Sequence, residues 1–263
     1  MISSYVDRYG KNPTGKDYCV GDIHGCFSTL KSALDIIGFD ERLDRLFSVG
    51  DLVDRGPESD TVLDWLALPW FHAVQGNHED MAIDHVNSGK QSCENYKMNG
   101  GSWLIDMQRD QQNAIVSELA VLPYAIEVET EIGMVGIIHA DCPCSTWSEM
   151  VERFADVASK YELRRLTDQC LWARKRIETG DRSGVPDVRA VIVGHTPIIH
   201  PLVLGNVYHI DTRGWLPGNG YFTFVDLETL EITLPIPGMT SAADRSQSNL
   251  QGPRPSANRE ARQ

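Results

Sequence analysis

The sequence predicts an α/β fold in which helices flank two β-sheets, and three observations support that prediction. Three short apolar runs in the first third of the chain each end in a glycine-led polar cluster, with helical patterns between them. Closely spaced β-rich runs follow from about residue 124, as in a sheet built from hairpins. The length of 263 residues and the 41% content of apolar residues are sufficient for one large domain with a buried core.

The early apolar runs are interpreted as buried strands whose following loops carry function. They are DYCV before Gly21, RLFSV before Gly50 and FHAVQ before Gly76. Apolar residues at helical spacing predict a helix over 27–37 that Gly38 ends, and Pro57 is expected to open a second helix running to about Leu66. Strands that alternate with helices predict right-handed crossovers and a parallel sheet, with all three polar clusters at the carboxyl edge where ligands bind.

The remaining segments predict helices beside this edge and a second, mixed sheet. Residues 81–122 are polar and helical in character, with a break at Gly100 and Gly101, and are interpreted as a helical cap-like segment. A further helix is expected over 161–178, ending near Gly180. The second sheet is expected to contain YAIEVET, GMVGIIHA, VRAVIVGH, NVYHIDT, YFTFVDL and LEITLPI. We predict a single domain over 1–238 and a disordered tail over 239–263, where large apolar residues nearly vanish.

Composition excludes several classes of partner. The formal net charge is −13, so bulk electrostatics favours neither nucleic acid nor an anionic membrane. No run approaches the roughly 18 to 20 apolar residues that span a bilayer, and the first residues lack the apolar core of a signal peptide, so a soluble cytoplasmic protein is expected. The six cysteines are interpreted as reduced thiols, with zinc binding by Cys142 and Cys144 as a minor alternative because their spacing is unusually tight. The sequence predicts no oligomeric state.

Five polar clusters carry the residue types that bind metal ions. They are Gly21-Asp22-Ile23-His24-Gly25, Gly50-Asp51-Leu52-Val53-Asp54-Arg55-Gly56, Gly76-Asn77-His78-Glu79, His139-Ala140-Asp141 and Gly194-His195-Thr196. Carboxylate, imidazole and amide oxygen suit divalent ions of the Mn, Fe and Zn type, and two such ions roughly 3.5–4 Å apart clamp an in-line displacement at phosphorus. Bound cations would also let an acidic protein attract an anionic substrate.

The order GDxHG, GDxVDRG and GNHE, with about 25 residues between motifs, resembles the phosphoprotein phosphatase family of metallophosphoesterases, in its lambda-type bacterial and phage branch. The likeness extends to IGFD at 37–40, SVGDLVDRG at 48–56, PWF at 69–71 and GHTP at 194–197, and it covers most of 17–226. The resemblance implies a metallophosphoesterase-type α/β/β/α sandwich of two mixed sheets flanked by helices, with the metal site at strand carboxyl ends. The domain over 1–238 would then be the catalytic domain of a serine/threonine protein phosphatase.

The resemblance also implies two divalent metal ions, with Mn²⁺ expected and Fe, Zn or Ni as alternatives. The first ion would be bound by Asp22, His24 and a bridging Asp51. The second would be bound by the same bridging residue together with Asn77, His139 and His195.

The catalytic and phosphate-binding residues are assigned in the same way. His78 would be the general acid, with Asp54 orienting its imidazole, and the phosphate oxygens would be bound by Arg55, Asn77 and, on a weaker motif match, Arg174. Independently of the family, a hydroxide held between two cations is nucleophilic near neutral pH, and a serine alkoxide leaving group needs a proton donor. The expected reaction is a single in-line displacement without a phosphoenzyme.

Some of these residues have simpler explanations. An Asp or Asn after a strand is more often a turn or a helix cap than a ligand, but that would have to hold for three clusters at once. Arg174 lies in a predicted helix rich in basic residues, where a solvated face is the ordinary explanation. Arg213 stands where relatives commonly have glycine after Asp-Thr and is interpreted as a surface residue, with a phosphate or acidic-peptide contact as the alternative. The histidines outside the motifs are expected to be structural: His72, His85, His200 and His209.

Three functions are considered. The leading hypothesis is hydrolysis of phosphoserine and phosphothreonine in phosphorylated proteins or peptides, with phosphotyrosine as a further candidate. The alternative is a dinucleoside tetraphosphate hydrolase of the same superfamily, disfavoured because such hydrolases usually lack the acid found here at Asp54 and have Asp in place of Glu79. A metal-binding scaffold without catalysis has no support, because Asp54, Arg55 and His78 are all present.

Overall fold

The first sheet is built on the three apolar runs near the start of the chain. The structure, a computed structural model, describes residues 5–89 and 92–234. The runs form β2 (Asp17–Val20), β3 (Arg45–Ser48) and β4 (Phe71–Ala73), which pair in parallel in that order. Most of their side chains are buried, as expected for strands covered on both faces. The predicted parallel core of the first sheet is confirmed.

The helices between these strands follow the sequence signals in one case and depart from them in the other. Helix α1 (Phe27–Ile37) ends at Gly38, which has the left-handed φ of 75° typical of a C-terminal glycine. The second helix starts later than predicted, because a 3₁₀ turn, η1 (Ser59–Thr61), precedes α2 (Val62–Leu66). The backbone N–H of Glu58 donates to the Gly25 carbonyl at 2.9 Å, so this segment is tied to the first loop before the helix begins.

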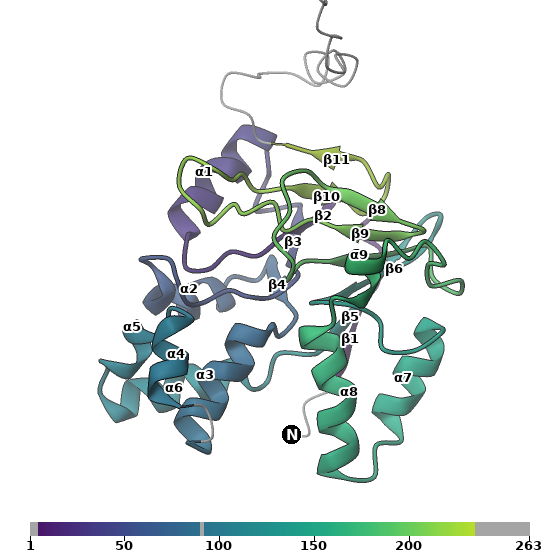
Figure 1. Cartoon of the computed structure of the whole chain (residues 1–263). Helices are drawn as coiled ribbons and strands as arrows, with labels where there is room; N and C mark the ends of the chain where they lie inside the picture. Colours follow the sequence, from purple (N-terminus) through teal and green to yellow (C-terminus); the bar gives the residue numbers. More distant parts are fainter. Residues whose placement is uncertain (1–4, 90–91, 235–263) are drawn as a thin grey trace, which may run out of the picture.

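Four helices occupy the segment after β4 and lie beside the first sheet (Figure 1). They are α3 (Asn77–Asn87), α4 (Cys93–Met98), α5 (Ser102–Ile105) and α6 (Arg109–Leu119). The helical character predicted from residue 81 therefore begins four residues earlier, at Asn77. Gly76 has an extended backbone at the N-cap, and the Glu79 side chain accepts from its N–H, which fixes the start of α3 inside the third polar cluster.

The second sheet has the strand order β1-β5-β6-β7-β9-β8. Its strands are β1 (Val6–Tyr9), β5 (Ala125–Thr130), β6 (Gly133–Ile138), β7 (Ala190–Val193), β8 (Leu202–Leu204) and β9 (Val207–His209). The predicted hairpin is confirmed as the antiparallel pair β5 and β6. The sequence interpretation missed β1 and β8, which are short and only partly buried.

Two strands assigned from sequence to the second sheet belong to the first. Strand β10 (Phe224–Asp226) pairs antiparallel with β2, and β11 (Ile232–Thr233) pairs with β10. The prediction was wrong because local spacing identifies a strand but not its distant partner. With this correction both sheets are mixed.

Helices α7 (Trp147–Ala155), α8 (Lys160–Trp172) and α9 (Lys175–Thr179) belong to the second half of the molecule. The single helix predicted over 161–178 is therefore wrong: it is interrupted at Ala173, whose ψ of 133° is extended. Gly180, with φ 66°, ends α9 where the sequence predicted. The break removes Arg174 from a continuous helical face, and its guanidinium donates to the Thr196 hydroxyl at 3.2 Å.

Three apolar clusters define the layers of the fold. One lies between the first sheet and its helices and includes Leu30 and Leu46. A second contains side chains from both sheets, such as Phe47 and Ile137, so the sheets face each other. The third joins the second sheet to α7 and α8 and includes Trp147. These layers form the predicted α/β/β/α sandwich.

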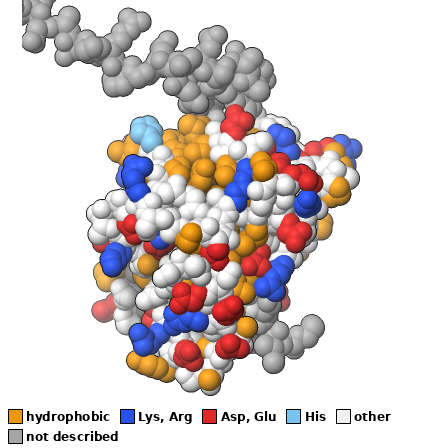
Figure 2. All heavy atoms as spheres, turned by 90° about the vertical axis from the view of Figure 1, so that its right-hand side faces the viewer, with side chains coloured by type: hydrophobic (Ala, Val, Ile, Leu, Met, Phe, Trp, Pro, Cys, Tyr) orange, Lys and Arg blue, Asp and Glu red, His pale blue; other side chains and the backbone are white. Residues whose placement is uncertain are grey.

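The face drawn in Figure 2 carries interspersed acidic and basic side chains, with hydrophobic side chains gathered toward its upper end. In the described ranges no helix is long and apolar enough to cross a bilayer. The single domain over 1–238 stays a prediction, and the predicted tail over 239–263 lies outside the described residues.

His72 predicts a pH dependence of stability. Burial, with a further contribution from Arg45, lowers the pKa of His72 to about 4, and its Nδ1 lies 3.2 Å from the Tyr9 hydroxyl. In an unfolded chain the pKa of histidine is about 6.5. Between pH 6.5 and pH 4, His72 is therefore protonated in the unfolded chain but not in the folded chain. The stability that is present above pH 6.5 is lost as the pH falls through this window.

We expect His72→Gln to lose less stability than the wild type between pH 7 and pH 5.5. The difference should be on the order of 0.5–1 kcal/mol after allowance for partial solvent screening, measured by urea unfolding at both pH values. His200→Gln, at an exposed position, is the matched control and should follow the wild type. Identical pH dependence for His72→Gln and the wild type would contradict the prediction.

Candidate active site

The loops that follow β2, β3, β4, β6 and β7 carry the five polar clusters. Backbone hydrogen bonds join the first two loops, because the N–H groups of Ile23 and His24 both donate to the Asp51 carbonyl, at 3.0 and 2.8 Å. In the second sheet, the Gly194 N–H donates to the His139 carbonyl at 2.8 Å. His139 Nδ1 lies 2.7 Å from the Val49 carbonyl, so the carboxyl edges of the two sheets meet, which is where α/β folds bind ligands.

The backbone at this edge is strained at many of its functional positions. Five non-glycine site residues have left-handed φ angles between 47° and 70°: His24, Asp51, Asp54, Arg55 and His195. Such conformations cost about 1–3 kcal/mol each and persist only where surrounding contacts hold them. Gly76 shows how tight the packing is, since a Cβ there would lie 2.3 Å from the Asp51 nitrogen.

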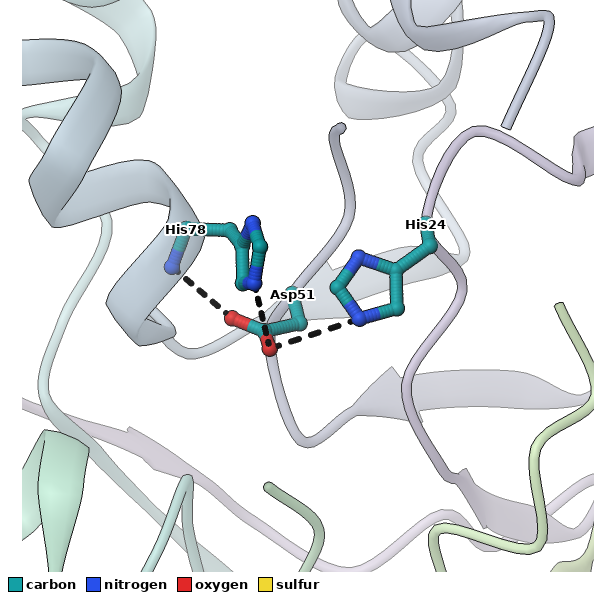
Figure 3. A group of neighbouring side chains, drawn as sticks. All are labelled: His24, Asp51 and His78. Carbon is teal, nitrogen blue, oxygen red and sulfur yellow. Dashed lines mark hydrogen bonds and ion pairs between the residues drawn. The ribbon is translucent and has the colours of Figure 1, made fainter. Parts of the chain in front are cut away.

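Asp51 is at the centre of the site and is 2% exposed. Its Oδ2 lies 3.6 Å from His24 Nε2 and 3.9 Å from His78 Nε2, and its Oδ1 lies 3.4 Å from His139 Nε2. Figure 3 shows the rings of His24 and His78 directed at this carboxylate, which also accepts from the His78 backbone N–H at 3.0 Å. Burial raises the pKa of Asp51, but positive charge on the neighbouring imidazoles, which bound cations would replace, outweighs burial and holds the pKa far below its usual value.

The histidine rings are oriented with their lone pairs toward one another. His24 Nδ1 is 2.9 Å from the Val53 carbonyl and His139 Nδ1 is 2.7 Å from the Val49 carbonyl. Each Nδ1 therefore carries the proton, and each Nε2 keeps the lone pair with which an imidazole binds an ion. Asn77 Oδ1 then lies within 2.9 Å of His139 Nε2 and 2.8 Å of His195 Nδ1. Acceptor atoms this close repel one another unless a cation or a proton lies between them, so this donor set fits a divalent metal ion.

Two triads of side chains that could each hold a metal ion result, and they share one residue. They are His24, Asp51 and His78, and Asp51, His139 and His195. Burial lowers the pKa of all three expected histidine ligands, to about 3 for His195, so these rings are neutral as metal ligands must be. A buried binuclear site bridged by Asp51 is consistent with this arrangement.

Asp22 lies beside this group but is not in either triad. Its two carboxylate oxygens accept from the His195 backbone N–H at 3.1 and 3.2 Å. Burial raises the pKa of Asp22 well above its usual value, and the nearby carboxylates of Asp211 and Asp51 raise it further. Divalent cations would relieve this crowding of acidic groups. The first triad contains His78 where the family resemblance placed Asp22.

The expected general acid and its partner are in contact. His78 Nδ1 lies 2.7 Å from Asp54 Oδ2, and both side chains are almost completely buried. Burial lowers the pKa of His78, but Asp51 and Asp54 outweigh this effect and raise the pKa above its usual value, which favours the proton-donating form. The Arg55 guanidinium lies between two of these rings, with Nη1 2.8 Å from His24 Nε2 and Nη2 3.0 Å from His78 Nε2.

Arg174 and Arg213, whose roles the sequence indicated only weakly, differ in position. Arg174 is held by Thr196, directly after His195, and its charge helps to lower the pKa of both His139 and His195, so it faces the site. Arg213 is partly buried with φ 61°, and its backbone N–H donates to Asp211 Oδ1 at 3.0 Å. Of the histidines outside the motifs, neither ring nitrogen of the buried His209 has a hydrogen-bond partner, and none of the four lies in a triad of the described chain.

A model of the calcineurin-like phosphoesterases matches residues 18–199. The chain belongs to this family. The matched range contains all five clusters from which the phosphoesterase builds its two triads.

Relatives of this phosphoesterase include two bacterial protein phosphatases. Serine/threonine-protein phosphatase 1 of Salmonella typhimurium is 37% identical over 200 residues, covering 74% of this chain and 85% of that protein. Serine/threonine-protein phosphatase 2 of Escherichia coli is 32% identical over 217 residues, covering 80% and 92%. The symmetrical bis(5'-nucleosyl)-tetraphosphatase of Serratia proteamaculans is 47% identical, but over only 64 residues, which is 24% of this chain and 23% of that protein.

Solved structures share the fold at lower identity. One described as a candidate diadenosine tetraphosphatase has a TM-score of 0.58 at 22% identity and covers 90% of this chain and 99% of its own. A protein serine/threonine phosphatase from Saccharomyces cerevisiae has a TM-score of 0.56 at 17% identity, covering 85% and 77%. These likenesses confirm the metallophosphoesterase fold and carry no argument about substrate.

The structure of this phosphoesterase adds residues whose part in the site the sequence did not indicate. Both oxygens of Glu79 accept backbone N–H groups, from Gly76, Asp51, Leu52 and Val53, at 2.7 to 3.2 Å. It thereby holds the second loop against the third, although burial and the Asp51 charge raise its pKa to about 7. The GNHE motif contains Glu79, but in the sequence this residue served only to recognise the family and had no assigned role in the site.

Trp215 also contacts the site. The Arg55 guanidinium carbon lies 4.6 Å from the centre of its ring, and the His24 and Trp215 rings are 5.1 Å apart. Such stacking of a cation on an aromatic face restrains the arginine side chain. The sequence signal was the unusual Asp-Thr-Arg-Gly-Trp run, which was noted only for Arg213.

Metal addition should stabilise this phosphoesterase. Adding Mn²⁺ to chelator-treated protein at about 100 times its dissociation constant should stabilise the fold by about 2.7 kcal/mol per site. For a domain of this size that corresponds to a rise of about 5–10 °C in Tm, measured by scanning calorimetry.

Asp51→Asn should abolish most of that rise, because the bridging charge is lost. Asp64→Asn, at an exposed position on α2, is the matched control and should keep the full shift. A full metal-dependent shift in Asp51→Asn would refute the bridging arrangement.

Proposed function

We propose that this phosphoesterase is a metal-dependent protein phosphatase that hydrolyses phosphoserine and phosphothreonine monoesters, with phosphotyrosine as a further candidate substrate. The proposal is carried by the buried His78–Asp54 pair, 2.7 Å apart, beside the Asp51 carboxylate and Arg55. A serine or threonine alkoxide is a poor leaving group, so its departure needs a positioned proton donor. The relatives that match over 200 residues or more are serine/threonine-protein phosphatases 1 and 2, and they support the same substrate class.

The alternative, a dinucleoside tetraphosphate hydrolase, has weaker support. The tetraphosphatase relative matches over 64 residues, whereas the protein phosphatases match over 200 or more. Hydrolysis of a tetraphosphate expels a nucleotide phosphate, which is a far better leaving group than an alkoxide. A dedicated acid paired with a buried carboxylate is therefore better explained by phosphomonoester hydrolysis.

The proposed roles of the side chains follow from their positions. The two bound ions would supply Lewis acidity and lower the pKa of a bound water, with Asp22, His24, Asp51, Asn77, His139 and His195 as the proposed ligands. Arg55 and Arg174 offer bidentate donors to phosphate oxygens, with the Asn77 amide beside them. His78 donates the proton to the leaving oxygen. Asp54 accepts from the Nδ1–H group of His78 and so keeps Nε2 of His78 directed at the substrate.

Mn²⁺ is the proposed ion, because a mixed carboxylate, imidazole and amide ligand set without thiolates suits it, with Fe, Zn or Ni as alternatives. We also propose that the protein acts on phosphorylated proteins in the cytoplasm. The six cysteines are all free thiols, which is typical of a reducing compartment.

The substrate class is tested by comparing a phosphoserine peptide with diadenosine tetraphosphate under identical conditions with Mn²⁺. We expect kcat/KM to be at least about 100-fold higher for the peptide, a difference of roughly 2.7 kcal/mol in transition-state binding. A preference for the tetraphosphate would overturn the proposed function and leave the metal site unaffected.

The role of His78 is tested by its leaving-group dependence. His78→Asn should lower kcat by about 100-fold or more on the phosphoserine peptide and much less on p-nitrophenyl phosphate, because a good leaving group needs little protonation. His200→Asn, at an exposed position outside both triads, is the control. Equal losses on the two substrates would argue against a general acid at this position.

A further inference from the structure

Asp54 is held from two sides, and only one of them belongs to the expected catalytic motifs. The side chain is completely buried and its Oδ2 faces His78. Its other oxygen, Oδ1, lies 2.7 Å from the indole Nε1 of Trp103 and 3.0 Å from the hydroxyl of Tyr96, both of which donate to it. A buried carboxylate with donors on both oxygens has its rotation about the Cβ–Cγ bond fixed.

Tyr96 and Trp103 come from α4 and α5, in the segment that the sequence presented only as a helical cap. Tyr96 is completely buried, and burial together with the Asp54 charge raises its pKa, so it keeps its hydroxyl proton at all working pH values. The His85 ring packs on the Tyr96 ring with centres 5.1 Å apart. This packing therefore fixes the position of the Tyr96 hydroxyl that donates to Asp54.

The turn between the two helices is shaped to fit against the second polar cluster. Gly100 has φ 99°, and a Cβ there would lie 2.4 Å from the Arg55 backbone nitrogen. A Cβ on Gly101 would lie 2.4 Å from the Tyr96 ring. Only glycine allows α4 and α5 to approach Asp54 and Arg55 this closely, so the segment contacts the catalytic loop through its backbone as well as through its two donors.

We propose that Tyr96 and Trp103 are positioning residues for catalysis: they fix the Asp54 carboxylate so that its free oxygen aligns His78 for proton donation to a poor leaving group. The proposal rests on the proposed role of His78 as the general acid. If one donor is lost, Asp54 can rotate or accept water, and the His78 ring is no longer held in the productive orientation. The helical segment thus takes part in selecting esters with poor leaving groups.

A role in packing alone makes a different prediction. Tyr96 belongs to the apolar cluster between the first sheet and its helices, and Trp103 packs against it. If their role were packing alone, their loss would lower stability and reduce activity on every substrate equally. A positioning role instead reduces kcat selectively where the leaving group needs a proton, with little change in KM. Leaving-group dependence therefore separates the two explanations.

The test uses the full-length, Mn²⁺-loaded protein with Trp103→Phe and Tyr96→Phe, which keep the rings and remove the donors. The substrates are phenyl phosphate and p-nitrophenyl phosphate, which differ in leaving-group basicity and require no protein substrate. We expect kcat on phenyl phosphate to fall about tenfold for each variant, as for a lost hydrogen bond to a charged group, with KM within about twofold. The loss on p-nitrophenyl phosphate should be less than about threefold.

The matched control is Trp147→Phe. Trp147 is completely buried, whereas Trp103 is partly buried. The indole nitrogen of Trp147 donates to Glu127 at 2.9 Å, and Trp147 belongs to the cluster on the second sheet, away from Asp54. It should lose stability without a leaving-group-dependent change in kcat. The double variant Trp103→Phe with Asp54→Ala completes the test, because Trp103→Phe should add less than about twofold once the carboxylate through which it acts is gone.

Equal losses on the two aryl phosphates would overturn the proposal, as would unchanged kcat in both single variants or a full Trp103→Phe effect in the Asp54→Ala background. If Trp103→Phe does not fold, Tyr96→Phe alone decides between the same outcomes, since it removes a single oxygen. Failure of the proposed function is a separate result: it would appear as a wild-type preference for diadenosine tetraphosphate, whatever the variants do on aryl phosphates.

Discussion

The site depends on the buried carboxylate of Asp51 and the imidazoles around it. A carboxylate that is 2% exposed is stable in ionised form only if positive charge or donors surround it. Here His24, His78 and His139 approach it within 3.4 to 3.9 Å, from both sheets. Because the His24 and His139 rings turn their lone pairs toward the same space, divalent cations would complete the arrangement. They would also let a protein of net charge −13 bind an anionic ester.

The rest of the fold holds that carboxylate in place. The left-handed backbone at Asp51, Asp54 and Arg55 is unfavourable by itself. It is supported by Glu79, whose two oxygens accept from backbone N–H groups of the second loop and from that of Gly76 in the third. The α4 and α5 segment closes the other side through Tyr96 and Trp103. Five of the seven described non-glycine residues with left-handed φ lie at the edge where the chemistry occurs, and the other two are Arg213 and Leu230.

The sequence predicted the parts of this structure that depend on neighbouring residues. Gly38 ends a helix because its left-handed backbone suits glycine, and the three early clusters follow buried strands, so their position at the sheet edge was predicted directly. It failed where the decisive partner is distant. Strand β10 pairs with β2 rather than with its neighbours in sequence, and α8 stops at Trp172 although helical residues continue beyond it. Tyr96 and Trp103 were missed for the same reason, because an aromatic residue in a helical segment gives no local sign that it donates to a carboxylate on another loop.

The central claim, two cations bridged by Asp51, is tested most directly by a crystal structure of the Mn²⁺-loaded protein with anomalous diffraction data. The account predicts two anomalous peaks roughly 3.5–4 Å apart on either side of the Asp51 carboxylate. One peak should be in contact with His24 and the other with Asn77, His139 and His195. A single peak, or peaks that Asp51 does not bridge, would contradict the account.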